Sequence, residues 1–132
     1  MYELRVQGRF SAAHKLRGYE GDCARLHGHS WRLEFALRAE GLDATGMAVD
    51  FKEIKQIIRD ITGVWDHRNL SELEDFKEMN PTAENIARLA FERFSQALSA
   101  RAACASRAAH AVRVTVWESE NCSASYSGAA CA

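Results

Sequence analysis

Three histidines and one cysteine lie close together near the start of this 132-residue sequence. Cys23 comes four residues before His27, and a single glycine separates His27 from His29. Alternate side chains of an extended strand point to the same face, so this spacing puts two imidazoles side by side. Two imidazoles supply most of the protein ligands of a catalytic zinc ion, which has three such ligands and one open position. The best candidate for the third ligand is His14, at the end of the first predicted strand.

A His-x-His pair alone is a weak signal, because most such pairs have no role in metal binding. A single cysteine such as Cys23 also packs as a small apolar residue in many proteins. The count strengthens the metal hypothesis, since three of the five histidines are near one another in the sequence with a cysteine among them. One alternative of a different kind stays open. Cys23 would be the fourth ligand of a closed, structural zinc site in a binding module without turnover.

Alternating residues indicate the strands that must position these side chains. Residues 2–10 and 29–40 alternate apolar and polar side chains, which predicts two half-buried strands. The loop between them, residues 15–26, is too long for a tight hairpin and carries the candidate chemistry. Residues 112–117 and 122–126 predict a third and a fourth strand, and an irregular tail follows from residue 127 to 132.

Two segments between the strands have helical periodicity. From Phe51 to Ile61 the apolar residues follow one helical stripe, with Asp50 as the predicted N-cap and Gly63 as the end. A second helix is predicted after Thr82, which is a typical N-cap residue. The alanine-rich stretch 100–109 either extends this helix or forms a loop, and the pattern does not decide between the two.

The order ββααββ predicts an α+β fold with a four-stranded antiparallel sheet and two helices on one face. The length suits one domain over residues 1–132. A net charge of −1 gives no general attraction to nucleic acid or to an anionic membrane. The sequence contains neither a long apolar run nor a signal-like start, so we expect a cytoplasmic protein. In a reducing cytoplasm the four cysteines would be free thiols, and they lack the C-x-x-C spacing of a zinc ribbon.

Five motifs in order give the sequence a resemblance to a known family. The sequence resembles the 6-pyruvoyltetrahydropterin synthase superfamily, and within it the bacterial 6-carboxytetrahydropterin synthases of queuosine and deazapurine biosynthesis. The motifs are Phe10–His14, Cys23–His29, Asp66–His67, Pro81–Asn85 and Trp117–Glu118. The resemblance covers residues 1 to 126, and the three residues between Cys23 and His27 favour the carboxytetrahydropterin subgroup. The alanine-rich stretch 100–109 is longer than the family pattern.

The resemblance implies a fold, an assembly and a reaction. The fold would be the tunnelling fold, in which trimers close a barrel and two trimers stack into a homohexamer with active sites at subunit interfaces. The substrate would be 7,8-dihydroneopterin triphosphate. The products would be 6-carboxytetrahydropterin, acetaldehyde and triphosphate. A related activity is the alternative, since 6-pyruvoyltetrahydropterin synthases act on the same substrate without cleaving a carbon–carbon bond.

The resemblance also implies roles for individual residues. Zinc held by His14, His27 and His29 would bind the hydroxyls of the substrate side chain. Cys23 would be the general base, acting as a thiolate. His67 would relay the proton, with Asp66 orienting its ring through a hydrogen bond. Glu118 would hold the pterin, because one carboxylate accepts both N–H groups of a guanidine-like edge.

Four further residues have weaker assignments. Thr82 and Glu84 are helix-start residues first, with a secondary role near the pterin or in an interface. Lys15 and Arg25 are candidates for contacts to the triphosphate. We interpret Arg17, in the same loop, as part of a solvated rim.

Overall fold

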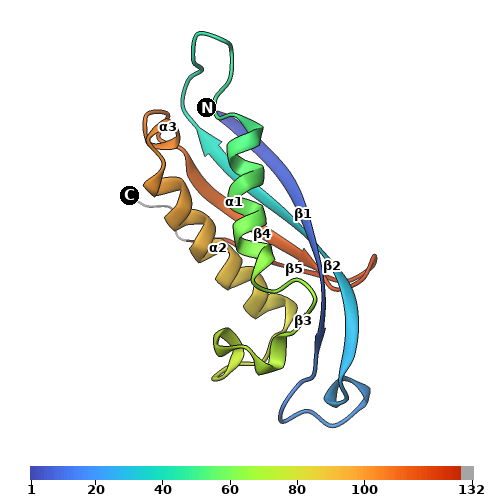
Figure 1. Ribbon diagram of the computed structural model, residues 1–132. Helices are drawn as coiled ribbons and strands as arrows, with labels where there is room; N and C mark the ends of the chain where they lie inside the picture. The colour runs from blue at the N-terminus through green and yellow to red at the C-terminus, as the bar shows by residue number, and fades with distance from the viewer. Residues whose placement is uncertain (129–132) are drawn as a thin grey trace.

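The structure of this chain, a computed structural model, is a twisted sheet with helices packed on one of its faces (Figure 1). It describes residues 1–128, so the end of the predicted irregular tail, with Cys131, lies outside the described residues. The sheet has the order β3-β1-β2-β4-β5. Its strands are β1 (Tyr2–His14), β2 (His27–Ala39), β3 (Arg68–Asn69), β4 (His110–Trp117) and β5 (Ser123–Tyr126).

The four predicted strands are present and pair antiparallel, as expected from the alternating patterns. One strand was not predicted: β3 pairs parallel with β1, through Ala12 and Ala13 only. The sheet is therefore mixed and five-stranded rather than purely antiparallel and four-stranded. Along the rest of β1 the outer edge has no strand partner among residues 1–128.

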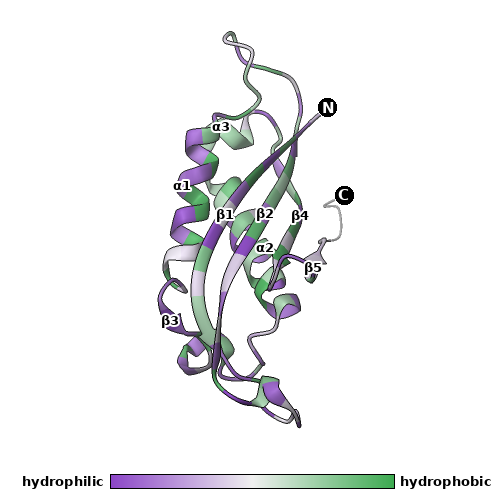
Figure 2. Cartoon of the chain, turned by 90° about the vertical axis from the view of Figure 1, so that its right-hand side faces the viewer, coloured by the Kyte–Doolittle hydropathy of each residue, from purple (hydrophilic) through white to green (hydrophobic). Residues whose placement is uncertain are grey.

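Helix α1 (Phe51–Gly63) packs against β1 through its stripe of isoleucines, which is buried. Asp50 caps it as predicted, because its side chain accepts a hydrogen bond from the Lys52 amide. Gly8 allows the close approach of helix and strand, since a Cβ atom at that position would lie 2.5 Å from Cγ2 of Ile58. Figure 2 shows the two-sided character of α1, with hydrophilic and hydrophobic residues on different sides of the helix.

Helix α2 (Ala83–Ala100) covers β4 and β5. Its core contact is Phe94, whose ring lies 5.0 Å from that of Phe35 on β2. Thr82 caps the helix as predicted. The alanine-rich stretch does not extend the second helix: α2 ends at Ala100, and a separate turn of helix, α3 (Ala102–Ala105), follows within the connection to β4.

Strands β1 and β2 continue past the end of α1 (Figure 1). Around this end lie the loop 15–26, which carries the short 3-10 turn η1 (Asp22–Ala24), and the 70–80 segment, which carries the 3-10 turns η2 (Leu70–Glu72) and η3 (Glu74–Phe76). The candidate site residues lie at this end of the sheet. None of the helices in the described part of the chain is both long enough and apolar enough to span a membrane.

Candidate metal site

The pairing of β1 with β2 brings the three histidines together. His14 lies directly opposite His27, and His29 lies opposite Ala12, two pairs further along the same ladder. Side chains alternate between the faces of a sheet, so positions 12, 14, 27 and 29 all belong to one face. This is the face that carries the core residues Phe10 and Trp31, which also pair across the two strands.

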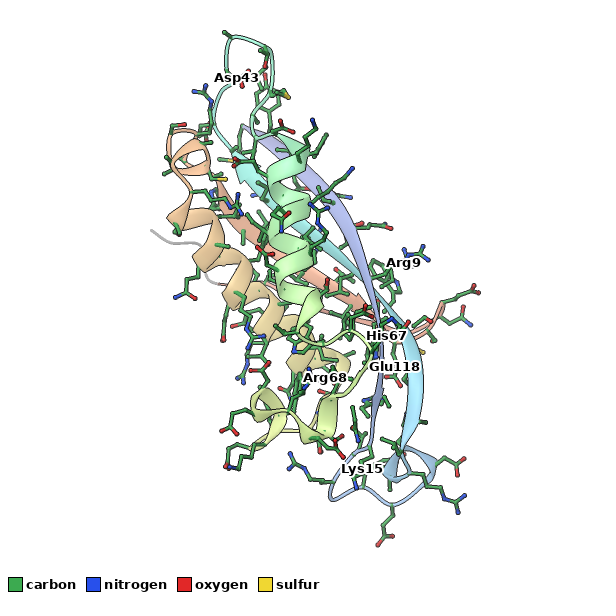
Figure 3. All side chains as sticks on the ribbon, viewed as in Figure 1. Arg9, Lys15, Asp43, His67, Arg68 and Glu118 are labelled. Atoms are coloured by element: carbon green, nitrogen blue, oxygen red, sulfur yellow. The ribbon has the colours of Figure 1, made fainter. Side chains whose placement is uncertain are left out.

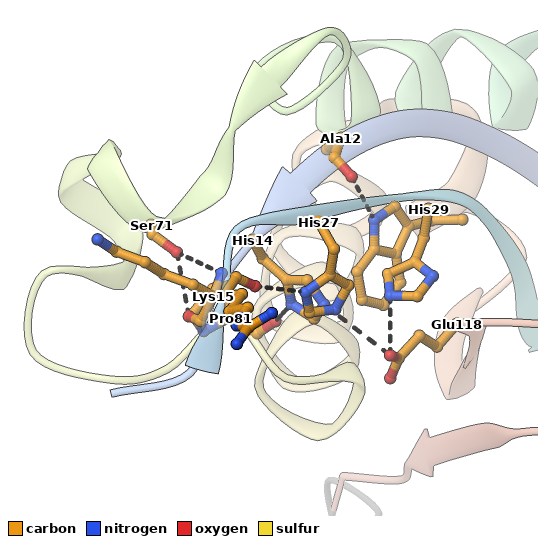
Figure 4. A network of polar contacts seen from close by, with 10 residues as sticks. Ala12, His14, Lys15, His27, His29, Ser71, Pro81 and Glu118 are labelled. Atoms are coloured by element: carbon orange, nitrogen blue, oxygen red, sulfur yellow. Dashed lines mark hydrogen bonds and ion pairs between the residues drawn. The ribbon is translucent and has the colours of Figure 1, made fainter. Parts of the chain in front are cut away.

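The three imidazoles form a compact triangle (Figure 4). Their ring centres lie 4.6 Å apart for His14 and His27, 5.1 Å for His14 and His29, and 4.8 Å for His27 and His29. Trp31 forms the floor, with its ring 5.0 Å from that of His14. His14 is 2% exposed, so the triangle is closed on the core side and open toward solvent only past His27 and His29.

Glu118, directly after β4, is the fourth member of this cluster. Its Oε1 atom lies 2.9 Å from Nε2 of His29 and 3.9 Å from Nε2 of His14. One donor atom from each of the four residues, His14, His27, His29 and Glu118, lies within 4.8 Å of the other three. The sequence motif pointed to Glu118 as a substrate anchor and gave no sign that it approaches the histidines, because the register of β4 against β2 is not readable from the sequence.

Backbone carbonyls fix which nitrogen of two rings faces the cluster. Nδ1 of His14 lies 2.7 Å from the carbonyl oxygen of Pro81, and Nδ1 of His27 lies 2.7 Å from that of Arg25. A carbonyl oxygen only accepts, so both Nδ1 atoms carry the hydrogen, and in the neutral form of each ring the electron pair is on Nε2. Such hydrogen bonds to the outer nitrogen are typical of histidines that bind metals.

Two imidazole nitrogens in this cluster are buried without a hydrogen bond. Within residues 1–128, Nε2 of His14 has none, and neither has Nε2 of His29, despite the nearby Glu118 oxygen. The 2.9 Å approach of His29 and Glu118 does not have hydrogen-bond geometry, so the two groups are not aimed at each other. Buried polar atoms without partners are rare in proteins. Free electron pairs that converge on one small space fit a bound metal ion.

The protonation of the cluster also suits a metal. Burial lowers the pKa of His14, and the neighbouring His27 lowers it further, against the opposing effect of the Pro81 hydrogen bond. Burial likewise lowers the pKa of His29, with Glu118 opposing. Both rings are therefore neutral at neutral pH, which is the form that binds a cation.

The thiol of Cys23 is half-buried and lies on η1, in the loop between β1 and β2. Its sulfur is not among the four donor atoms of the cluster. The fourth protein group is thus Glu118, and the closed zinc site with Cys23 as the fourth ligand is not formed. Together with Cys104 and Cys122, Cys23 is a free thiol, as predicted for the cysteines in the described residues.

Arg17 is exposed, as expected of a rim residue, but it also attaches the loop of Cys23 to the rest of the fold, which was not predicted. Its guanidinium donates to the carbonyl oxygens of Phe76 at 2.7 Å and Lys77 at 2.9 Å. Its backbone exchanges two hydrogen bonds with the side chain of Asn80, both 2.9 Å long. The Leu16 amide then donates to the carbonyl of Cys23, which carries the attachment across the loop.

Asp66 and His67 lie outside the cluster, on the turn after α1. The Asp66 carboxylate accepts from the Ser11 amide at 2.9 Å, and the His67 amide donates to the Ser11 carbonyl, so both are fixed to the outer edge of β1. The hydrogen bond expected between their side chains is not formed, because the closest approach is 3.6 Å. The side chain of His67 is 82% exposed (Figure 3). Within one chain these residues do not reach the histidine triangle.

The remaining predicted residues take different positions. Thr82 is at the N-terminus of α2, where its hydroxyl accepts from the Asn85 amide, next to Pro81. Arg25 contributes its carbonyl to His27, which places its backbone at the cluster. The backbone of Lys15 is hydrogen-bonded to Ser71, and its side chain points away from the imidazoles (Figure 4).

Comparisons with known proteins show the family and the fold of this chain. The family model of 6-pyruvoyl tetrahydropterin synthase matches residues 3–129. A 6-carboxy-5,6,7,8-tetrahydropterin synthase from Rickettsia felis is 36% identical, over 59% of this chain and 69% of its own length. A dihydroneopterin monophosphate aldolase from Pyrococcus furiosus is 37% identical, over 67% of this chain and 71% of its own. The 6-pyruvoyl tetrahydropterin synthase structure from Caenorhabditis elegans has a TM-score of 0.83 and 26% identity, with 97% of this chain and 96% of that chain covered.

Proposed function

This chain belongs to the 6-pyruvoyl tetrahydropterin synthase family, and on that premise we propose that it is a 6-carboxytetrahydropterin synthase of queuosine and deazapurine biosynthesis. The reaction would convert 7,8-dihydroneopterin triphosphate and water to 6-carboxy-5,6,7,8-tetrahydropterin, acetaldehyde and triphosphate. The observation that carries this proposal is the convergence of three imidazoles on one space, with two buried nitrogens that lack hydrogen bonds. The Rickettsia felis relative, which carries this name, supports the choice of reaction.

The ion that fits the cluster best is zinc. His14, His27 and His29 would be its three protein ligands, which leaves a position for substrate, as in catalytic zinc sites. Imidazole nitrogens suit zinc better than the hard cations calcium and magnesium, which prefer oxygen. When bound, zinc supplies Lewis acidity that lowers the pKa of the substrate's side-chain hydroxyls. The carbonyls of Pro81 and Arg25 would hold two of the rings in the right tautomer.

Cys23 would remove the proton from the substrate side chain. A thiolate is the reactive form, and a nearby cation lowers the pKa of a thiol. The loop that carries Cys23 is fixed to the 76–80 segment through Arg17 and Asn80, whereas the thiol itself is outside the donor set. This arrangement supports a base that acts beside the metal, because the sulfur would be free to accept a proton.

His67 and Asp66 would relay that proton from a second copy of the chain. In one chain they lie at the outer edge of β1, and His67 is almost fully exposed. A catalytic histidine so far outside a site is unusual, but this edge of β1 is open for another subunit over most of its length. We therefore include the homohexamer, a dimer of trimers with active sites at its interfaces, in the proposal.

Glu118 has two candidate roles that exclude each other at any one moment. Where it lies, the carboxylate would be a fourth ligand of the metal. As the pterin anchor it would hold the guanidine-like edge of the substrate, which is at the opposite end of the bicyclic ring from the reacting side chain. The side chain is one-third exposed and borders a cavity of about 580 Å³ on the other side. We infer that substrate binding turns Glu118 from His29 toward this cavity.

The remaining substrate contacts follow from position. Arg25 is next to the cluster and would meet the triphosphate, and Thr82 would line the approach beside Pro81. Lys15 would take part only if its side chain turned back from its present direction. These three assignments depend on the reaction proposed above.

A second candidate function is 6-pyruvoyltetrahydropterin synthase activity, with the same substrate and without carbon–carbon cleavage. The observation in its favour is the similarity to the Caenorhabditis elegans structure along nearly the whole chain. A non-catalytic zinc module is less well supported, because its closed site would need Cys23 as a ligand and Glu118 stands in that place.

One experiment separates these functions. The purified, zinc-loaded chain would be incubated with 7,8-dihydroneopterin triphosphate, and the pterin product, acetaldehyde and triphosphate would be measured, with chelator-treated protein as the control. We expect all three products in equal amounts. Triphosphate without acetaldehyde would assign the pyruvoyl reaction instead. Zinc binding without any turnover would leave only the binding module.

A further inference from the structure

The segment that holds the Cys23 loop is itself anchored through Asp75, on the 3-10 turn η3. The carboxylate of Asp75 accepts two hydrogen bonds from side chains. Oδ1 accepts from Nη2 of Arg93 at 2.6 Å, and Oδ2 accepts from the indole nitrogen of Trp65 at 3.0 Å. The donors come from different elements, because Trp65 follows the end of α1 and Arg93 lies in the middle of α2. One side chain thus joins three parts of the fold.

The surroundings of Asp75 strengthen these contacts. The side chain of Asp75 is 26% exposed and that of Arg93 is 34% exposed, so both are partly shielded from water. Burial by itself raises the pKa of Asp75, but the hydrogen bonds from Arg93 and Trp65 outweigh it and lower the pKa. The guanidinium carbon of Arg93 also lies 5.4 Å from the centre of the Trp65 ring. The carboxylate is therefore ionised at neutral pH, and its hydrogen bond to Arg93 is charge-assisted.

Trp65 connects this carboxylate to the turn that carries Asp66–His67. Trp65 directly precedes that turn, and its side chain is completely buried. Its ring lies 5.5 Å from that of Phe10 on β1 and 6.0 Å from that of Phe76 on η3. The bond from its indole nitrogen to Asp75 therefore orients a large core side chain whose backbone leads straight into the candidate relay.

In the other direction, Asp75 fixes the carbonyl groups that hold the Cys23 loop. Phe76 and Lys77 directly follow Asp75, and their carbonyl oxygens accept from the Arg17 guanidinium at 2.7 Å and 2.9 Å. Hydrogen bonds weaken steeply when they are misaligned, so a rotation of η3 would break both contacts. The residue before Arg17 donates its backbone amide to the Cys23 carbonyl at 2.9 Å. The contacts thus run without interruption from α2 to the loop of the candidate base.

We propose that Asp75 is a positioning residue for both candidate proton-transfer groups, the Cys23 thiol and the Asp66–His67 turn. Without its carboxylate, η3 loses its attachments to α2 and to Trp65, and the carbonyls that hold Arg17 are no longer fixed. Misplacement of a reacting group by about 1 Å costs roughly 100-fold in rate. The inference rests on the proposed function, because the two groups act as base and relay only in that reaction.

Steady-state kinetics of the zinc-loaded Asp75→Asn variant measures this positioning. Asn keeps the size of the side chain but has one acceptor oxygen instead of two, so either Arg93 or Trp65 loses its partner. We expect kcat with 7,8-dihydroneopterin triphosphate to fall roughly 10- to 100-fold, with little change in KM or zinc content. Glu74→Gln is the matched control, because it removes an exposed carboxylate from the same turn, 3.8 Å from Lys77. Wild-type kcat in Asp75→Asn would overturn the inference.

A cycle with Arg17→Gln tests whether Asp75 acts through the Cys23 loop. If it does, the variant that combines Asp75→Asn with Arg17→Gln loses little more kcat than the more impaired single variant, because both substitutions break one chain of contacts. Losses that multiply would refute this route. Trp65→Phe is a second variant in case Asp75→Asn does not fold, since it keeps an aromatic ring in the core and removes the indole donor. We expect a smaller fall in kcat there, and wild-type kcat would count against the inference.

Alkylation of Cys23 separates failure of this inference from failure of the proposed function. We expect iodoacetamide to modify Cys23 several-fold faster in Asp75→Asn than in wild type or Glu74→Gln, because the loop opens more often. Mass spectrometry of the folded protein measures this without any need for turnover. Faster alkylation in a chain that forms no product would keep Asp75 as the support of the loop and refute the proposed function. Equal alkylation rates would refute the positioning role, whether or not the chain forms product.

Discussion

Nδ1 of His14 donates a hydrogen bond to the carbonyl oxygen of Pro81 at 2.7 Å. This bond joins the end of β1 to the residue that precedes the capped start of α2. It fixes the ring in the tautomer whose Nε2 atom faces the other two imidazoles. The most buried member of the candidate metal site is thus positioned by a segment 67 residues away in the sequence.

Zinc content should depend on the histidine triangle. We expect about one zinc ion per wild-type chain, and a loss of most of it in His27→Ala, because two imidazoles rarely hold the ion alone. Metal analysis of the dialysed protein measures this. His110→Ala is the control, since His110 lies at the start of β4, outside the cluster. Full zinc content and activity in His27→Ala would show that the ligands are misassigned.

The stability of the zinc-free protein should fall as the pH drops below about 6.5, the ordinary pKa of histidine. The folded state keeps His14 and His29 neutral because burial lowers their pKa, whereas the unfolded chain takes up protons there. The unfolded state then binds more protons, so the free energy of unfolding decreases with decreasing pH. Urea unfolding at pH 5.5, 6.5 and 7.5 measures the slope. A slope that is the same in His14→Gln as in wild type would contradict this account.

Cys23→Ala should abolish turnover without loss of zinc or of the fold. The reason is that the thiol lies on the loop that joins the two histidine-bearing strands but is outside the donor set. Product formation, metal content and circular dichroism are the measurements. Cys122→Ala, which removes an exposed thiol before β5, should keep activity. Near-normal turnover in Cys23→Ala would remove this residue from the mechanism, and a combined loss of zinc and activity would favour the structural zinc site.

Glu118→Gln tests the two roles of this carboxylate. If Glu118 anchors the pterin, the substitution leaves N–H donors of the bound pterin buried and unpaired. This costs roughly 1–3 kcal/mol and weakens pterin binding roughly 10- to 100-fold. Titration with a non-reactive pterin measures this, and Glu120→Gln on the same hairpin is the control. A fall in zinc affinity with unchanged pterin affinity would instead make Glu118 a metal ligand and place the pterin elsewhere.

Asn80→Ala should loosen the loop that carries Cys23. The substitution removes both hydrogen bonds between the Asn80 side chain and the Arg17 backbone, so the loop opens more often and its half-buried thiol becomes more accessible. Alkylation of Cys23 by iodoacetamide, followed by mass spectrometry, should be several-fold faster than in wild type. Arg59→Ala on α1 serves as a control for general destabilisation. Equal alkylation rates in Asn80→Ala and wild type would mean that other contacts hold the loop.

Local sequence patterns were sufficient for most of the fold. Alternation located four strands, the isoleucine stripe located α1, and Thr82 located the start of α2, because each depends on residues a few positions apart. Strand β1 extends to His14 beyond the predicted residue 10, since the small residues Ser11, Ala12 and Ala13 do not alternate in hydropathy although they pair in the sheet.

The contacts that the sequence did not predict are all long-range. Strand β3 has only two residues, and its pairing depends on the turn that brings Arg68 to Ala12. The sequence around Arg17 does not show that its guanidinium donates to the carbonyls of Phe76 and Lys77, because these residues are about 60 positions away in the chain. The His-x-His spacing predicted the clustering of the histidines, but the approach of Glu118 depends on the register between β2 and β4.

Most of the outer edge of β1 is unpaired in the single chain, and pairing with another copy of the chain would cover it. Strand β3 covers Ala12 and Ala13, and the backbone groups before them form an edge that another strand of any kind can extend. Charged side chains along it, Arg5 and Arg9 among them, discourage unwanted pairing but do not fill the edge. If copies of this chain assemble along β1, separating them does more than stop the chemistry. It exposes a template for aggregation, so failure of assembly would deplete the protein as well as inactivate it.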